Sequence, residues 1–179
     1  VLADDSMLLG ANTNAQETDE DYWNFGIVKV NSNGFVDATF GTNGKVVNDF
    51  GGADYITAIG EFEGKIIASG YSQISSNSKM VLLKYLSNGD LDATFGINGI
   101  VSTNLTTSTN DKITGMIVLN DGKLLCSGYT FNTSNADALL IKFNADGSID
   151  NQFNSVGYVT TDFDNNNDGV TKTIKEFIF

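Results

Sequence analysis

The residues Lys84-Tyr-Leu-Ser-Asn-Gly-Asp-Leu-Asp-Ala-Thr-Phe-Gly-Ile-Asn-Gly99 occur in three related copies along the chain. The other two copies cover residues 29–44 and 142–157, so the copies are 55 and then 58 residues apart. Each copy has Lys first, Gly sixth, Asp ninth, Phe twelfth and Gly sixteenth. A second segment supports the same period, because residues 65–71 match residues 123–129, again 58 positions apart. Recurrence at a fixed spacing of this size is typical of repeat proteins, in which each unit is one supersecondary structure.

Each period contains four short segments rich in β-branched, aromatic and large aliphatic residues, which predict strands. In the second unit these segments are residues 65–71, 80–86, 99–105 and 112–119. Asn-Gly or Asp-Gly pairs stand between most of them, and these residues tolerate the positive φ of tight turns. Residues 171–177 align with the strands that begin at Thr57 and Thr114, so we expect a strand there too. The sequence predicts an all-β chain of twelve main strands in three four-stranded groups.

The expected architecture is a β-propeller in which each blade is a four-stranded antiparallel sheet. The units are somewhat longer than the roughly 40–50 residues of common blades. We place blade-like units at about residues 1–62, 63–120 and 121–179, within a single repeat domain. Three blades are one fewer than the smallest common propeller, and both ends of the sequence interrupt the repeat. We therefore expect a larger propeller, in which further blades of the same chain or another protein cover the end sheets.

The composition argues against several classes of function. The 179 residues include 10 Lys, no Arg, no His and 22 acidic residues, for a net charge of −12. Such a chain has little affinity for a phosphate backbone, so nucleic-acid binding is not expected. The lack of His removes a common general base and the commonest transition-metal ligand. The apolar runs are far shorter than the roughly 20 residues of a membrane-spanning helix, so no transmembrane segment is expected.

The repeated pattern resembles the delta-60 repeat, a bacterial β-propeller repeat found in predicted secreted and surface proteins. The likeness rests on the Asn/Asp-Gly turn, the Asp-x-x-Phe-Gly-x-x-Gly segment and the Gly-Lys strand ending in Ser-Gly that follows it. It extends from Met7 to Phe177, with departures at Ser6, where other units have Lys, and at Asn154, where they have Gly. The resemblance implies a propeller located outside the cytoplasm, in the periplasm, at the cell surface or secreted. It implies no catalytic activity, because the family has none assigned.

The repeated side chains suit a structural role. A carboxylate three residues after a glycine turn can accept backbone N–H bonds and close the next turn. One large ring per unit can pack between adjacent sheets. Catalysis needs a unique constellation, whereas a scaffold repeats its elements. The structural repeat residues are Asp37, Asp92, Asp150, Phe40, Phe95 and Phe153.

Two further residues have structural interpretations. Cys126 corresponds to Ala68 in the repeated strand, which predicts a small core residue. As the only cysteine, it gives no information about the cellular compartment. Trp23, beside Tyr22, has no equivalent in the other units. Packing at a blade edge is favoured for Trp23, and a ring that stacks on a ligand is the alternative.

One segment outside the repeat pattern has the opening of a calcium loop. Asp164, Asn166 and Asp168 stand at positions one, three and five, and Gly169 follows at position six. Position twelve, where a bidentate Glu would complete the coordination sphere, is Lys175. A solvated Asn-rich and Asp-rich loop is therefore favoured, and calcium at these three ligands is the alternative. No other cofactor is expected.

Two classes of function remain. The favoured class is a non-enzymatic scaffold that binds another protein or a surface through a propeller face, within a secreted or envelope-associated bacterial protein. An accessory or plug subunit of an outer-membrane secretion assembly is one form of this class. The alternative is a carbohydrate-active hydrolase or lyase. It would use paired carboxylates, such as Asp54 and Asp111, acting across the central channel.

Overall fold

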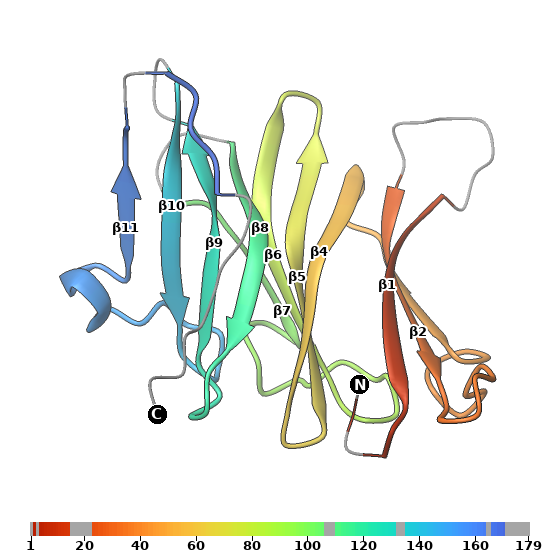
Figure 1. Cartoon of the computed structure of the whole chain (residues 1–179). Helices are drawn as coiled ribbons and strands as arrows, with labels where there is room; N and C mark the ends of the chain where they lie inside the picture. Colours follow the sequence, from red (N-terminus) through yellow and green to blue (C-terminus); the bar gives the residue numbers. More distant parts are fainter. Residues whose placement is uncertain are drawn as a thin grey trace.

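The computed structural model describes residues 2, 4–14, 23–105, 110–131, 135–163 and 166–170. Within these ranges the chain consists of β-strands, loops and one short 3-10 turn, η1 (Phe153–Ser155), with no α-helix. The strands form three antiparallel sheets that stand side by side in chain order (Figure 1). The all-β, blade-like architecture predicted from the repeat is confirmed. Nowhere in the described ranges is there a helix long and apolar enough to cross a membrane.

Eleven strands make up the sheets of the described chain. The first sheet has the order β1-β2-β3, the second β4-β5-β6-β7, and the third β8-β9-β10-β11. Their bounds are β1 (Met7–Asn14), β2 (Trp23–Val30), β3 (Lys45–Asn48), β4 (Ala53–Phe62), β5 (Lys65–Ile74), β6 (Asn77–Tyr85), β7 (Ile100–Thr103), β8 (Asp111–Val118), β9 (Leu124–Phe131), β10 (Ala136–Phe143) and β11 (Tyr158–Thr161).

The turns occupy the positions expected from the sequence. Gly89, Asn98 and Gly122 have φ angles of 92°, 54° and 76°, in the left-handed region that glycine favours and asparagine tolerates. The backbone N–H of Gly89 donates to the backbone oxygen of Leu86 at 3.0 Å and closes the turn after β6. Because the chain reverses at such turns, consecutive strands pair in an antiparallel manner.

The sheets are offset by one strand from the units inferred from the repeat. Three of the four strands predicted in the second unit belong to the second sheet, but the strand near residues 112–119 is β8, which belongs to the third. A fixed period does not reveal which strand begins a blade, because every starting point gives the same period. Backbone pairing decides it. Where four strands per sheet were predicted, the first sheet has three in the described part of the chain. The strand predicted at residues 171–177 lies outside it.

The second sheet is buried on both faces. Neighbouring residues along a strand point to opposite sides of the sheet. Ile66 and Val81 accordingly pack in the core shared with the first sheet, while Ile67 and Leu82 pack in the core shared with the third. Each pair of neighbouring sheets thus encloses its own apolar core. Sheets packed face to face in succession are the arrangement of propeller blades.

Candidate functional site

Asp92 lies in the loop between β6 and β7 and is 3% exposed. Its Oδ1 atom accepts hydrogen bonds from the backbone nitrogen of Thr94 at 3.2 Å and from the Thr94 hydroxyl at 2.7 Å. The Nζ atom of Lys65 donates to Oδ2 at 2.7 Å. The bond from Lys65, together with those from Thr94, lowers the pKa of Asp92 to about 2. The carboxylate therefore stays ionised at neutral pH and holds the loop against β5.

The same arrangement recurs around the other two repeated aspartates. Asp150 accepts a backbone N–H bond from the residue two positions on and pairs with Lys123 at 2.9 Å, and this lysine is the main cause of its lowered pKa. Asp37 also accepts a backbone N–H bond from the residue two positions on, and pairs with Lys29 at 3.3 Å. Lys29 replaces the partner that the first unit lacks, because Ser6 stands where the other units have lysine. Each carboxylate is thus engaged within its own sheet.

The repeated phenylalanines differ in burial. Phe40 and Phe95 are both 1% exposed and lie in the cores between the first and second sheets and between the second and third sheets. Phe153 is only half-buried, contrary to the prediction of one buried ring per unit. The difference follows from its place in the third sheet, beyond which no further sheet packs within the described residues.

Asp54 and Asp111, the carboxylates considered as a catalytic pair, are both fully buried. Oδ2 of Asp54 accepts a hydrogen bond from the backbone nitrogen of Phe50 at 2.8 Å. Oδ2 of Asp111 accepts the equivalent bond from Leu105 at 2.7 Å, and its Oδ1 accepts one from the hydroxyl of Thr130. Burial raises the pKa of Asp54. Both side chains thus close the loops that lead into β4 and β8, inside the protein.

Asp168 is a third member of this series. It follows Asp111 by 57 residues, as Asp111 follows Asp54. Its Oδ2 accepts a hydrogen bond from the backbone nitrogen of Phe163 at 2.7 Å, which repeats the loop closure of the other two sheets. The position is therefore repeated, although the sequence analysis treated it as part of a unique loop. The spacing of 57 residues was the available signal, and the surrounding Asn-rich segment obscured it.

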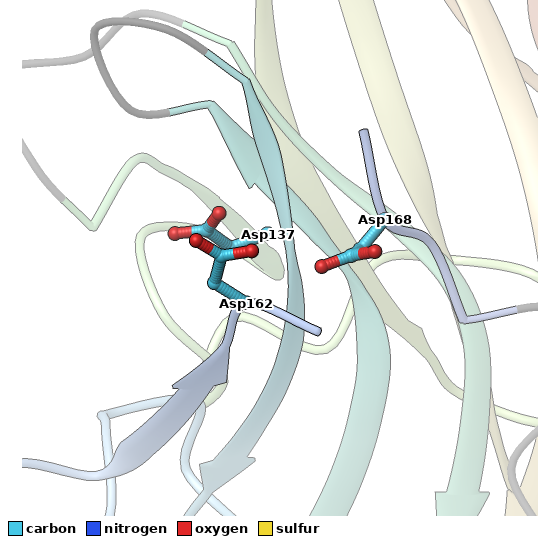
Figure 2. A group of neighbouring side chains, drawn as sticks. All are labelled: Asp137, Asp162 and Asp168. Carbon is cyan, nitrogen blue, oxygen red and sulfur yellow. The ribbon is translucent and has the colours of Figure 1, made fainter. Parts of the chain in front are cut away.

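Asp168 also belongs to a group of three carboxylates that can hold a metal ion. Asp137 of β10 and Asp162, just after β11, complete the group, and one oxygen from each residue lies within 4.8 Å of the others. Figure 2 shows Asp168 pointing toward Asp137 and Asp162 from the last described segment of the chain. Carboxylate oxygens are the ligands that calcium prefers, so the donor set suits a hard divalent cation.

The other predicted calcium ligands are placed differently. Asp164 lies outside the described residues. Asn166 is exposed, and its backbone oxygen accepts a hydrogen bond from the side-chain amide of Asn135 at 2.8 Å. Of the three predicted ligands, Asp168 alone belongs to the carboxylate group.

A cluster of three tyrosines and a lysine lies at the innermost strands, and the sequence analysis did not identify it. The ring of Tyr55 stacks on that of Tyr71, with centroids 4.8 Å apart. Lys112 Nζ lies 4.4 Å from the centroid of the Tyr71 ring and 5.9 Å from that of Tyr129, so it bridges the second and third sheets. Burial lowers the pKa of Lys112 and is the main cause that raises the pKa of Tyr71 to about 12. Tyr55 and Lys112 occupy equivalent repeat positions, but the change of residue type hid the equivalence.

The two remaining candidates have structural surroundings. Cys126 is 0% exposed, as is its counterpart Ala68, and burial raises the pKa of its thiol. A buried thiol of this kind is unreactive. Trp23 begins β2, is half-buried and pairs through its backbone with Asn14 of β1. Its neighbour Tyr22 lies outside the described residues.

Comparison with known proteins gives one family match. Residues 64–95 and 119–153 match the model of a β-propeller domain of unknown function (DUF5122). These two stretches contain the Lys strand and the Asp-x-x-Phe segment of the second and third units. No curated protein and no solved structure matches the chain. The repeats are therefore those of a β-propeller family.

Proposed function

We propose that this β-propeller scaffold is non-enzymatic and that it binds another protein or a surface. The observation that supports this proposal is where the exposed apolar side chains lie. Most large apolar side chains exposed in the described residues belong to the two outer sheets and their loops, whereas the second sheet is enclosed. Those of the outer sheets are Met7, Leu9, Phe35, Val36, Val47, Val156, Val159 and Phe163. Apolar surface gathered in this way is typical of an interaction site.

The surroundings of the acidic residues also favour a scaffold over a carbohydrate-active enzyme. A glycosidase needs two carboxylates that reach the scissile bond from opposite sides of the sugar. Asp54 and Asp111 are fully buried, and each accepts a backbone hydrogen bond in its own loop. The repeated Asp92 and Asp150 pair with lysines of their own sheets. These four carboxylates have structural partners instead of an accessible site.

The location and the setting of the protein are part of the same proposal. The resemblance to the delta-60 repeat favours a secreted or envelope-associated bacterial protein, in the periplasm, at the cell surface or outside the cell. An accessory or plug subunit of an outer-membrane secretion assembly is one form that such a scaffold can take. The acidic composition, with its net charge of −12, gives nucleic acid no part in this proposal.

Site-specific photo-crosslinking in the producing cell tests the interaction role. A photo-reactive residue would be placed at position 9 in the first sheet, at position 159 in the third, and at position 74 as a control. Ile74 is a suitable control because it is 53% exposed, close to the 56% of Leu9, but lies at the end of β5 in the enclosed sheet. We expect crosslinked products from positions 9 and 159 and few from position 74. Equal crosslinking from all three positions, together with turnover of a glycan substrate, would contradict the proposal.

A further inference from the structure

Neighbouring sheets contact each other through a repeated, directional bond. The backbone N–H of Gly41, beside the first sheet, donates to the backbone oxygen of Asn88 of the second at 2.7 Å. The backbone N–H of Gly96 makes the same bond to Asp146 of the third sheet at 2.8 Å. Each bond runs from the Phe-Gly segment of one sheet to the Asn/Asp-Gly turn of the next. We call the face of a sheet that carries the Phe-Gly segment its forward face, and the face that carries the turn its backward face.

The third sheet has a complete forward face. Asn154 occupies the glycine position and has a φ of 48°, close to the 54° of Gly41 and the 53° of Gly96. Asparagine tolerates this left-handed conformation, so the backbone that supplies the donating N–H is preserved. The preceding ring, Phe153, is half-buried, whereas Phe95 in the same position is 1% exposed. The forward face of the third sheet therefore has the required parts, with its ring only partly covered.

The first sheet has the matching backward face. The turn that ends at Gly34 is closed by the bond from its N–H to the oxygen of Asn31 at 3.0 Å, as the turn at Gly147 is closed by the bond to Asn144 at 2.9 Å. A Cβ atom built on Gly147 would lie 3.0 Å from the ring of Phe95, which covers this turn. A Cβ atom built on Gly34 would have no neighbour within 4 Å. The turn of the first sheet is thus uncovered.

The strand beside this turn is uncovered as well. Leu9 pairs with Val28 in the first sheet as Ala68 pairs with Leu83 in the second, and Val28 and Leu83 are 55 residues apart in the repeat. Ala68 is 0% exposed because the first sheet packs on it, but Leu9 is 56% exposed. The backward face of the first sheet therefore exposes apolar surface at a position that the same contact buries one sheet further on.

We propose that a second copy of this chain occupies these faces, with the forward face of each third sheet packed against the backward face of the other copy's first sheet. The contact continues the interface seen twice within the chain, and this inference rests on the interaction role proposed above. A head-to-tail contact either closes into a ring or extends into a filament. Propellers contain about 4–8 blades, so with three sheets per copy the ring closes with two copies. In this pair Phe153 covers Gly34 of the other copy.

The charge of the chain gives the pair a distinctive salt dependence. Each copy carries a net charge of −12, so two copies repel each other at low ionic strength. Salt screens this repulsion but leaves burial of Leu9 and Phe153 favourable. Association is therefore expected to tighten as the salt concentration rises.

Sedimentation velocity and light scattering on the 179-residue chain test the proposal. We expect a species of twice 19.2 kDa whose dissociation constant falls between 50 and 500 mM NaCl. Leu9→Lys, on the backward face, and Val159→Asp, on the forward face, should each weaken association at least tenfold. The matched control Ile74→Lys should leave it unchanged. Far-UV circular dichroism checks that each variant is folded.

Mixing the two variants tests the head-to-tail arrangement. A pair made of one Leu9→Lys copy and one Val159→Asp copy has one unsubstituted interface, so the mixture should associate more tightly than either variant alone. A wild-type chain that stays monomeric at all salt concentrations would overturn self-association. Dimers insensitive to both substitutions would do the same. A monomer that still crosslinks another protein through position 9 would refute the pair and leave the interaction role standing. A monomer without such crosslinks would count against both.

Discussion

The hydroxyl of Thr57 donates a hydrogen bond to the backbone oxygen of Ile113 at 3.0 Å and thereby joins β4 to β8. Thr114, which is 57 residues further on, makes the same bond to the backbone oxygen of Val170 at 2.6 Å. The bond thus passes from one innermost strand to the next segment in the series. Neighbouring sheets are held together by directional polar bonds as well as by their apolar cores.

Replacement of Thr57 by valine should destabilise the contact between the second and third sheets. Valine keeps the shape of threonine but leaves the oxygen of Ile113 without this donor, which costs about 1–3 kcal/mol where the oxygen is shielded from water. Thr57→Ser restores the hydroxyl and should recover most of the loss. Urea denaturation of the three proteins measures the difference. Equal midpoints for the valine and serine variants would show that the bond contributes nothing to stability.

Phe95→Ala should cost about 3–5 kcal/mol in the free energy of unfolding, because it leaves a cavity in the core between two sheets. Phe153→Ala should cost clearly less in dilute protein, because its ring is only half-buried. Denaturant midpoints measured at low protein concentration give the order. Equal losses would mean that Phe153 is fully packed in solution.

The blade architecture was predictable because the repeated Lys, Gly, Asp and Phe columns fix the period and the turns. The grouping of strands into sheets was not, since β8 follows the second motif in sequence but pairs with β9. The burial of a repeated residue was predictable only where a neighbouring sheet exists, as the difference between Phe95 and Phe153 shows. Contacts between units that use different residue types, such as Lys112 over Tyr71, leave no repeated signal.

Asp92→Asn should lower stability at neutral pH and have a smaller effect in acid. The pKa of Asp92 is lowered to about 2, chiefly by Lys65, from an unfolded value near 3.9. The stability that its charge contributes is therefore complete above about pH 4 and is lost as the pH falls toward 2. Denaturation midpoints of both proteins between pH 7 and pH 2 should converge on acidification. Lys65→Met should remove most of this pH dependence, and a difference that stays constant with pH would contradict the prediction.

Asp54→Asn should show the opposite pH trend. Burial raises the pKa of Asp54, so the folded state retains this proton more strongly than the unfolded state. Stability then falls as the pH rises from about 4 through the folded-state pKa. The amide variant does not ionise and should gain stability relative to wild type as the pH rises from 4 to 7. The same denaturation series measures this, and a relative stability that declines with rising pH would show that the carboxylate is favoured in its charged form.

Calcium should raise the melting temperature only modestly, if the hypothesis from the sequence is correct. Asp168 already uses one carboxylate oxygen to accept the bond from Phe163, so fewer oxygens are available to an ion than in a complete calcium loop. Binding with a dissociation constant of about 1 mM would add about 1 kcal/mol at 5 mM calcium. For a chain of this length, that corresponds to a rise of about 2–4 °C.

Two aspartate variants separate calcium binding from loop closure. Asp162→Asn should abolish the calcium-dependent rise and leave the melting temperature in EDTA nearly unchanged, because Asp162 is exposed. Asp168→Asn should lower the melting temperature both in EDTA and in calcium, since it weakens the bond to Phe163. Scanning calorimetry in EDTA, 5 mM calcium and 5 mM magnesium measures these shifts. A wild-type melting temperature that is the same in all three buffers would exclude millimolar calcium binding and leave loop closure as the role of Asp168.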